Sequence, residues 1–185
     1  MKMQKMGLMK KQKGATLLEA LAFLGIAAIV VVGAISMFRS AQGSAQSNDM
    51  VGQLNGLRSS VKTIFGSQAL YGSAAWSNTV STQALNQTLI NGKAVPDTLR
   101  ISGANITNSF NGSVQIDGDA NSFWIKYNNV PQEVCVKVAP QTGSSWLGLS
   151  INGTYTATDT AVFPVASAVA QCTAGSTNAM IWRAS

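Results

Sequence analysis

The sequence predicts an α+β fold in which one long N-terminal α-helix packs on an antiparallel β-sheet. Two observations carry this prediction: a helical pattern that runs from residue 15 to residue 65, and alternating strand patterns that follow residue 112. The chain has 185 residues, which suits one ordinary domain together with an appended element. We therefore expect a globular head and a helical extension.

The first part of the predicted helix is apolar on all sides. Residues 15–38 read ATLLEALAFLGIAAIVVVGAISMF, which is 24 residues with a single charge, Glu19. A helix needs about 20 apolar residues to span a bilayer, so this segment is long enough. Lysines precede it, and basic residues beside an apolar segment keep that end in the cytoplasm. We expect the N-terminal tail inside and the rest of the chain outside.

The net charge of +6 comes from this tail rather than from a basic surface. Beyond residue 14, eight basic residues face seven acidic ones. The charge therefore does not indicate a specific nucleic-acid partner. The tail's basic residues are five of the thirteen in the chain: Lys2, Lys5, Lys10, Lys11 and Lys13.

The second part of the predicted helix, residues 39–66, is amphipathic. Its apolar residues recur at spacings of 4, 3, 4 and 3, which is the period of one helical face. No proline precedes Pro96, although several glycines weaken the helix. This face should pack on the head, and its members are Met50, Leu54, Leu57, Val61 and Ile64.

Shorter elements are expected in the head, residues 67–185. A helix is predicted over residues 82–90 and another over residues 165–170. Residues 113–117, 121–127 and 133–138 are predicted to form three consecutive antiparallel strands, joined by turns at Asp117-Gly118 and Asn128-Asn129. Further strands are expected over residues 146–151, before an Asn152-Gly153 turn, and over residues 180–182.

The two cysteines, Cys135 and Cys172, are far apart in the sequence. In an exported protein they predict one disulfide, and two buried free thiols are the alternative. There is no CxxC pair and no histidine to complete a zinc site, so no metal and no cofactor is expected.

Glu19 is the feature that a plain membrane anchor leaves unexplained. A secretory signal peptide has an apolar core of about 7 to 15 residues, shorter than the segment here. A carboxylate in an apolar segment costs free energy and requires a partner, which marks it as functional.

The string Lys13-Gly14-Ala15-Thr16-Leu17-Leu18-Glu19, followed by the apolar run, resembles the class III signal sequence of type IV prepilins. The resemblance implies that a prepilin peptidase cleaves after Gly14 and methylates the new N-terminus at Ala15. Glu19 is then the fifth mature residue, and its implied role is to dock on the α-amine of a neighbouring subunit during assembly.

Two downstream features are also similar to pilins. The segment Thr107-Asn108-Ser109-Phe110-Asn111-Gly112 resembles a turn that precedes the first pilin strand, and the cysteines resemble those that bound the D-region, here residues 135–172. Ala15 as first mature residue and the cysteine placement favour type IVb pilins, of the bundle-forming or conjugative thin-pilus kind.

The resemblance implies a major pilin, a structural subunit that polymerises into a surface filament for adhesion, aggregation or mating contact. The implied parts are a leader (1–14), a filament-core helix (15–38), its amphipathic continuation (39–66) and the head (67–185). The implied partners are copies of the same chain, the prepilin peptidase, an assembly ATPase, an inner-membrane platform protein and an outer-membrane secretin. The precursor would lie in the inner membrane and the product on the cell surface.

Other functions are weighed against this one. An enzyme is not expected, because the chain has no histidine, no P-loop and no GxSxG motif, and Asp117 and Asp119 are interpreted as turn residues. A minor pilin or type II secretion pseudopilin shares the same N-terminal processing, and a monomeric membrane-anchored adhesin would not be cleaved. The tryptophans are interpreted as core or interface residues rather than a receptor site: Trp76, Trp124, Trp146 and Trp182.

Overall fold

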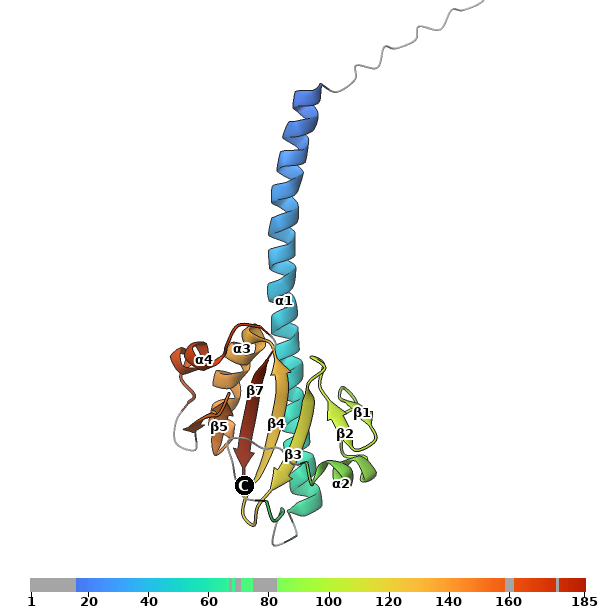
Figure 1. Ribbon diagram of the computed structural model, residues 1–185, viewed down its shortest axis with the longest axis vertical. Helices are drawn as coiled ribbons and strands as arrows, with labels where there is room; N and C mark the ends of the chain where they lie inside the picture. The colour runs from blue at the N-terminus through green and yellow to red at the C-terminus, as the bar shows by residue number, and fades with distance from the viewer. Residues whose placement is uncertain (1–15, 67, 69–70, 75–82, 159–161, 176) are drawn as a thin grey trace, which may run out of the picture. The chain divides into compact units, whose positions relative to one another are not determined.

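The computed structural model describes residues 16–66, 68, 71–74, 83–158, 162–175 and 177–185. The predicted α+β fold is confirmed. A helix, α1 (Leu17–Phe65), precedes a seven-stranded antiparallel sheet (Figure 1). By its contacts the chain divides into residues up to Ser40 and a unit from Ala41 to Ser185, which we call the head.

The predicted long helix is confirmed over 49 residues. Its head portion buries one face, because apolar residues three and four apart fall on the same side of a helix. Four of the five predicted core residues are buried, and the fifth, Ile64, is partly buried against the same core. The buried residues of this portion are Gly43, Ser47, Met50, Gln53, Leu54, Leu57, Val61 and Phe65.

The sheet has the order β1-β2-β3-β4-β7-β5-β6 with every neighbouring pair antiparallel. The last strand of the chain therefore lies between β4 and β5 rather than at an edge. The strands are β1 (Arg100–Ser102), β2 (Asn105–Thr107), β3 (Ser113–Gly118), β4 (Phe123–Val130), β5 (Gly148–Ile151), β6 (Thr154–Ala157) and β7 (Asn178–Ala184).

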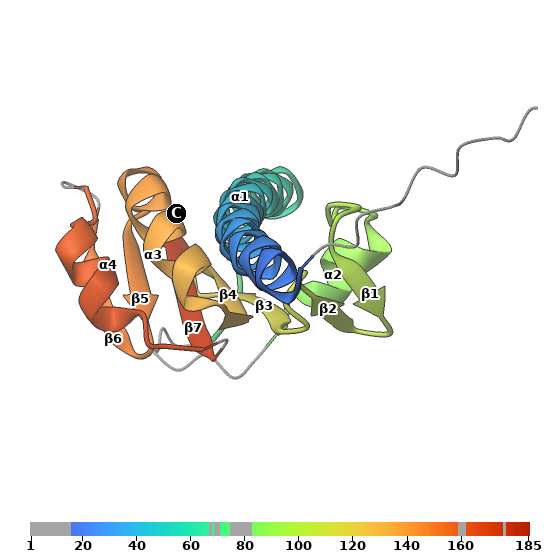
Figure 2. The ribbon, with the colours of Figure 1, turned by 90° about the horizontal axis from the view of Figure 1, so that it is seen from above.

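The helices of the head flank α1 on both sides (Figure 2). α2 (Asn86–Asn91) lies on the side of β1 and β2. α3 (Gln132–Thr142), a short 3₁₀ turn (Gly143–Ser145) and α4 (Val165–Gln171) lie on the side of β5 and β6. Together with α1, α3 covers one face of the sheet.

Hydrogen bonds between side chains join α1 and α3 to the sheet within the core. The Tyr127 hydroxyl of β4 bonds to the buried Gln53 amide oxygen of α1 at 3.4 Å. The Trp182 indole N–H of β7 donates to the Thr142 hydroxyl of α3 at 2.8 Å. Burial raises the pKa of Tyr127, because the ionised phenolate would lose its hydration.

The prediction that the tryptophans are core residues is confirmed for three of the four. Trp124, Trp146 and Trp182 are all buried, which supports core packing over a receptor site, and Trp76 lies outside the described residues. The guanidinium of Arg58 on α1 lies 5.1 Å from the Trp146 ring centre, a cation-π contact that joins α1 to the chain after α3.

The strand predicted over residues 133–138 is wrong, because these residues belong to α3. The alternation of Glu133 to Val138 mimics a strand, but the buried positions have a helical period: Val134, Cys135, Val138, Ala139 and Thr142. Pro131 stands at the helix N-terminus, where its missing N–H costs no hydrogen bond. The strand that pairs with β4 on the side away from β3 is β7 and not residues 133–138.

Both predicted turns around β4 are also displaced. Asp117 and Gly118 end β3, and the connection is made by residues 119–122, so Asp117 is a buried strand residue while Asp119 is a turn residue as expected. Asn128 and Asn129 lie within β4, where Asn129 has a φ of 59° beside an irregularity in the pairing with β7. The Asn152-Gly153 turn is confirmed, with φ values of 50° and 87° between β5 and β6.

The remaining predicted elements are found with shifted ends. The helix expected over residues 82–90 begins later, at Asn86, and residue 82 lies outside the described residues. The helix expected over 165–170 and the strands expected over 146–151 and 180–182 are confirmed as α4, β5 and β7. The strands β1, β2 and β6 were not predicted.

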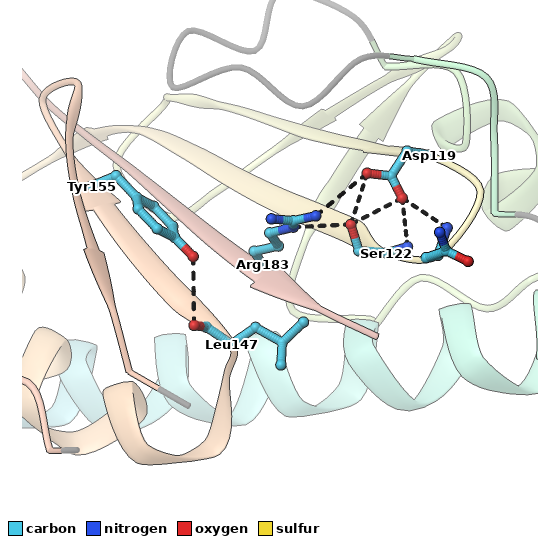
Figure 3. Close-up of polar contacts among 6 residues, drawn as sticks. Asp119, Ser122, Leu147, Tyr155 and Arg183 are labelled. Carbon is cyan, nitrogen blue, oxygen red and sulfur yellow. Dashed lines mark hydrogen bonds and ion pairs between the residues drawn. The ribbon is translucent and has the colours of Figure 1, made fainter. Parts of the chain in front are cut away.

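The C-terminal strand is fixed to the β3–β4 turn by a small polar cluster (Figure 3). The Arg183 Nε–H donates to the Ser122 hydroxyl at 2.9 Å, and its terminal nitrogen lies 3.6 Å from Asp119 Oδ2. Asp119 Oδ1 accepts the backbone N–H groups of Asn121 and Ser122 at 2.8 and 2.6 Å. Asp119 therefore shapes the turn and also holds the end of the chain.

Candidate assembly helix and disulfide-bounded region

The N-terminal half of α1 exposes nearly all of its apolar side chains. Leu17, Leu18 and Ile29 are 80%, 79% and 75% exposed, and Phe23 is 73% exposed. The most apolar 18-residue window has a mean hydropathy of 2.6 with none of it buried, so by length and composition this helix meets the requirement for crossing a membrane. An apolar surface of this extent requires an apolar partner, either lipid or protein.

Glu19 lies in the first turn of this exposed helix. Its backbone N–H donates to the Thr16 hydroxyl at 3.3 Å, which partly caps the helix N-terminus. No described residue of the same chain bonds to its carboxylate. A negative charge in the first turn is favoured by the helix dipole, but in an apolar surrounding it would still need a partner from elsewhere. Gly14 and Ala15, the predicted cleavage site, lie outside the described residues.

The predicted disulfide is confirmed. Cys135 of α3 bonds to Cys172, the residue that follows α4, with a Cα–Cα distance of 6.0 Å. Both cysteines are buried, and the Gln132 side-chain amide donates to the Cys172 carbonyl at 3.1 Å. The bridge closes a segment with a sequence separation of 37, which contains β5, β6 and α4.

A pair of asparagines anchors the end of this segment to the sheet. The buried Asn178 amide donates to the carbonyls of Val130 and Thr173, both at 3.0 Å. Its oxygen accepts from the Thr173 N–H at 2.8 Å and from the Asn152 amide at 2.9 Å. Asn152 in turn accepts the Ala179 N–H at 2.9 Å. The Asn178 side chain thus bonds to backbone groups of β4 and of the chain after Cys172, and to the Asn152 side chain in the β5–β6 turn.

The turn that resembles a pilin motif is organised by Asn108. Its oxygen accepts the N–H groups of Phe110 and Gly112 at 3.0 and 2.8 Å, and its amide donates to the Asn128 carbonyl at 2.8 Å. A side chain at Gly112 would collide with that same carbonyl, so glycine is required there. The turn brings β2 and β3 together.

Another asparagine, Asn86, performs the same task at the start of α2. It is fully buried, accepts the Ile116 N–H at 2.9 Å and donates to the Val114 carbonyl at 2.9 Å, so α2 is bonded to β3. Of these buried asparagines, Asn108 lies in a segment noted in the sequence, but none was assigned this role. Their signal is weak, because the chain is rich in asparagine and only burial separates Asn86, Asn108 and Asn178 from surface residues.

The described residues contain no cluster of three or more histidine, cysteine, aspartate or glutamate side chains suited to a metal ion. The features that remain are an exposed apolar helix with one acid and a head built on an antiparallel sheet with a disulfide-bounded region. Together they define a pilin-type subunit, in which an apolar helix is joined to a packed head.

Comparison with known proteins agrees with this class. The family model described as PilS N terminal matches residues 44–185, which is most of the chain. The chain therefore belongs to the PilS N-terminal family of type IVb pilins.

Curated relatives and solved structures extend the comparison. The chain is 26% identical over 151 residues to the major structural subunit of the bundle-forming pilus of Escherichia coli O127:H6, covering 77% of this chain and 72% of the relative, and the O111:H- protein matches equally. The type IVb pilin of Salmonella typhi shares the fold with a TM-score of 0.53 and 25% identity, covering 69% of this chain and 91% of that one. TcpA, a type IV pilin of Vibrio cholerae El Tor biotype, has a TM-score of 0.53 at 13% identity over 76% of this chain and 99% of its own, which shows the fold alone.

Proposed function

We propose that this chain is the major structural subunit of a type IV pilus, polymerised through its N-terminal helix into a surface filament. The observation that carries the proposal is the exposed apolar half of α1, from Leu17 to Phe38, in a chain whose head has its own core. A bundle of identical helices would remove this surface from water, and no active site is required. The names of the bundle-forming relatives support the same role.

The proposed precursor has residues 1–14 as a leader, which the prepilin peptidase removes after Gly14 while it methylates Ala15. Before assembly, residues 15–38 hold the chain in the inner membrane with the lysine-rich leader in the cytoplasm. Residues 39–66 continue the helix into the head, and residues 67–185 complete it. The assembled product is an extracellular filament.

Glu19 is proposed to set the axial position of each subunit. Its carboxylate would pair with the α-amine of Ala15 on a neighbouring chain, because both groups are charged and neither has an alternative partner in an apolar helix bundle. Removing one member of a buried charge pair costs about 3 to 5 kcal/mol, since the other charge stays buried and unpaired. The pairing would therefore favour one stagger between helices.

The chain lacks a nucleotide-binding motif such as the P-loop, so the work of extraction must come from other proteins. We propose an assembly ATPase, an inner-membrane platform protein and, at the outer membrane, a secretin as its partners. No specific nucleic-acid partner is proposed, because the excess positive charge resides in the leader.

The role of Glu19 is tested by comparing surface filaments from cells that express the wild type, Glu19→Gln and Glu133→Gln. Glu19→Gln keeps the size of the side chain and removes its charge, so it should leave the protein in the membrane fraction and abolish filaments. Glu133→Gln removes an exposed head carboxylate, whose ion-pair partner among the described residues is Lys137 at 2.7 Å, so filaments should persist. Normal filaments from Glu19→Gln would refute the docking role.

A further inference from the structure

Asparagine followed by glycine is prone to spontaneous deamidation in proteins. The backbone nitrogen of the glycine attacks the side-chain carbonyl carbon of the asparagine, because glycine carries no side chain that hinders the approach. A C–N bond forms to give a succinimide ring, the bond to the side-chain nitrogen breaks, and ammonia leaves with the glycine amide proton. Water then opens the ring to aspartate or isoaspartate. The chain contains four such pairs: Asn55-Gly56, Asn91-Gly92, Asn111-Gly112 and Asn152-Gly153.

The reaction requires two movements that a folded structure can prevent. The asparagine carboxamide must turn toward the glycine nitrogen, and the glycine N–H must leave any acceptor to which it donates. A pair in which either group is held by hydrogen bonds reacts only when those bonds open, and the free energy of opening lowers the rate. The contacts of each pair therefore decide which of them reacts in the folded chain.

Asn152 is held by its side chain. Its amide donates to the Gln171 carbonyl and to the Asn178 side-chain oxygen, both at 2.9 Å, and its oxygen accepts the Ala179 N–H at 2.9 Å. Turning the carboxamide onto Gly153 would break all three bonds, and one of the partners, Asn178, is buried. The β5–β6 turn is therefore protected, although Asn-Gly is the sequence that such turns favour.

Asn111 is held mainly at the glycine nitrogen. The Gly112 N–H donates to the Asn108 side-chain oxygen at 2.8 Å in a buried bond. The Asn111 side-chain oxygen also accepts from the Arg100 guanidinium at 3.3 Å. Reaction at this pair would require the turn between β2 and β3 to open.

Asn55 is held by its position in α1. It lies well inside this helix of 49 residues, where the N–H of each residue bonds to the carbonyl four residues earlier. Leu54 and Leu57, on either side of the pair, are fully buried, which fixes this part of the helix to the core. The Gly56 nitrogen is therefore tied to the helix.

Asn91 has the weakest restraints of the four. It is exposed and is the last residue of α2, a helix of only six residues, and short helices and helix ends open most readily. Its oxygen accepts one bond, from the exposed Gln87 amide at 2.8 Å, and among the described residues its amide nitrogen has no acceptor. The Gly92 N–H donates to the Thr88 carbonyl at 2.9 Å, a bond that is lost when the last turn frays. Opening one exposed turn thus frees both reacting groups.

We infer that Asn91 is the residue that deamidates in the folded chain, while the other three pairs keep their amides. The product places a carboxylate at the C-terminus of α2, where the helix dipole disfavours a negative charge. The last turn of α2 should then fray further, while Asn86 still anchors its first turn to β3. The modification needs only the folded chain and water, so it does not depend on assembly into a filament.

Ageing of the full-length chain, purified in detergent and kept in mildly alkaline buffer, tests the inference. Peptide mass spectrometry at intervals gives the deamidated fraction at each of the four pairs. Asn91 should deamidate about tenfold or more faster than Asn55, Asn111 or Asn152, since each of these must first open a held structure. A faster reaction at any of the other three would overturn the inference.

Two controls separate the effect of the fold from that of the sequence. In guanidinium chloride the same chain is unfolded, and the four rates should become similar, because each asparagine precedes a glycine. Gly92→Ala adds a methyl group beside the attacking nitrogen, at a φ of −77° that suits alanine, and should remove most of the reaction at Asn91. If Asn91 keeps its amide in the folded chain while the unfolded chain reacts at all four pairs, α2 protects it and the inference fails. If Asn91 leads by the same factor in both states, the fold does not select it, which contradicts the inference equally.

Discussion

At the scale of single residues, two glycines differ in the space that a methyl group would have at their position. Gly112 lies against the Asn128 carbonyl at the Asn108 turn, where a methyl group has no space. Gly52 on α1 has no atom within 4 Å of where a methyl group would be. The two glycines therefore predict opposite effects of the same substitution.

We expect Gly112→Ala to lower the free energy of unfolding by about 2 kcal/mol, because the turn must shift to relieve a backbone collision. Gly52→Ala should raise the same free energy by up to about 1 kcal/mol, because alanine favours the helix more than glycine does. Denaturant unfolding of the detergent-solubilised chain measures both. If both substitutions changed the free energy of unfolding in the same direction and by the same amount, the geometry described for the Asn108 turn would be contradicted.

Tyr127 predicts a pH dependence of stability. Its ordinary pKa is 10.0, and burial raises the pKa in the folded chain. Above pH 10 the unfolded chain loses the phenol proton while the folded chain keeps it. Ionisation therefore lowers the free energy of the unfolded state alone, and the stability of the fold decreases as pH rises. The loss of stability should be about 1.4 kcal/mol per pH unit from this group.

The measurement for Tyr127 is the free energy of unfolding at pH values between about 9 and 11. Tyr127→Phe keeps the ring and removes the titrating hydroxyl, so its stability should depend less steeply on pH than that of the wild type. Parallel curves for the two proteins would show that Tyr127 does not carry the effect.

At the scale of elements, the disulfide joins α3 to the chain just after α4. Replacing both cysteines by alanine should lower the free energy of unfolding by about 3 to 4 kcal/mol, the estimate for a loop of this length. The loss should be greatest in β5, β6 and α4, which lie inside the loop. Hydrogen exchange resolves this: faster exchange spread evenly over β3 and β4 as well would contradict a local role.

The elements with local signals were predictable from the sequence. The period of α1 fixed its buried face, and the Asn152-Gly153 pair located the β5–β6 turn. α3 was mistaken for a strand because valines alternate with polar residues from Glu133 to Val138. The helix forms because Pro131 starts it and its second half buries Ala139 and Thr142, a period that a six-residue window does not reveal.

The order of the strands in the sheet could not be predicted from local sequence patterns. β7 pairs with β4 across about 50 residues, as in the Tyr127 and Met180 pairing, and no turn signal connects them. The strands β1 and β2 have only three residues each, too few to show an alternating pattern, and Ile106 of β2 is their one buried residue. The asparagine anchors were missed for a related reason, since their partners are distant backbone groups.

At the scale of the whole molecule, the head should fold without the apolar half of α1. The buried residues of α1 begin at Gly43, and the contacts divide the chain between Ser40 and Ala41. A fragment of residues 41–185 should be soluble and unfold cooperatively, with a free energy of unfolding within about 1 kcal/mol of the full chain. An aggregated or unfolded fragment would show that residues 17–40 contribute to the core.

The same division explains how one chain serves two environments. The Asn108 and Asn178 networks bond buried polar groups of the head to one another, and the head has its own apolar core, so we expect it to remain folded without a partner. The apolar half of α1 has no such cover among the described residues, so in the proposed assembly it would exchange lipid for other helices. In the proposed filament, assembly would depend on this apolar surface and on Glu19.

The most direct test is the composition of filaments sheared from the cell surface. We predict that mass spectrometry will find this chain as their main component, with an N-terminus at a methylated Ala15. The filaments should disappear when the gene is deleted and return with the wild-type gene. A chain that remains full length in the membrane fraction, with no filament that contains it, would contradict the assignment as a pilus subunit.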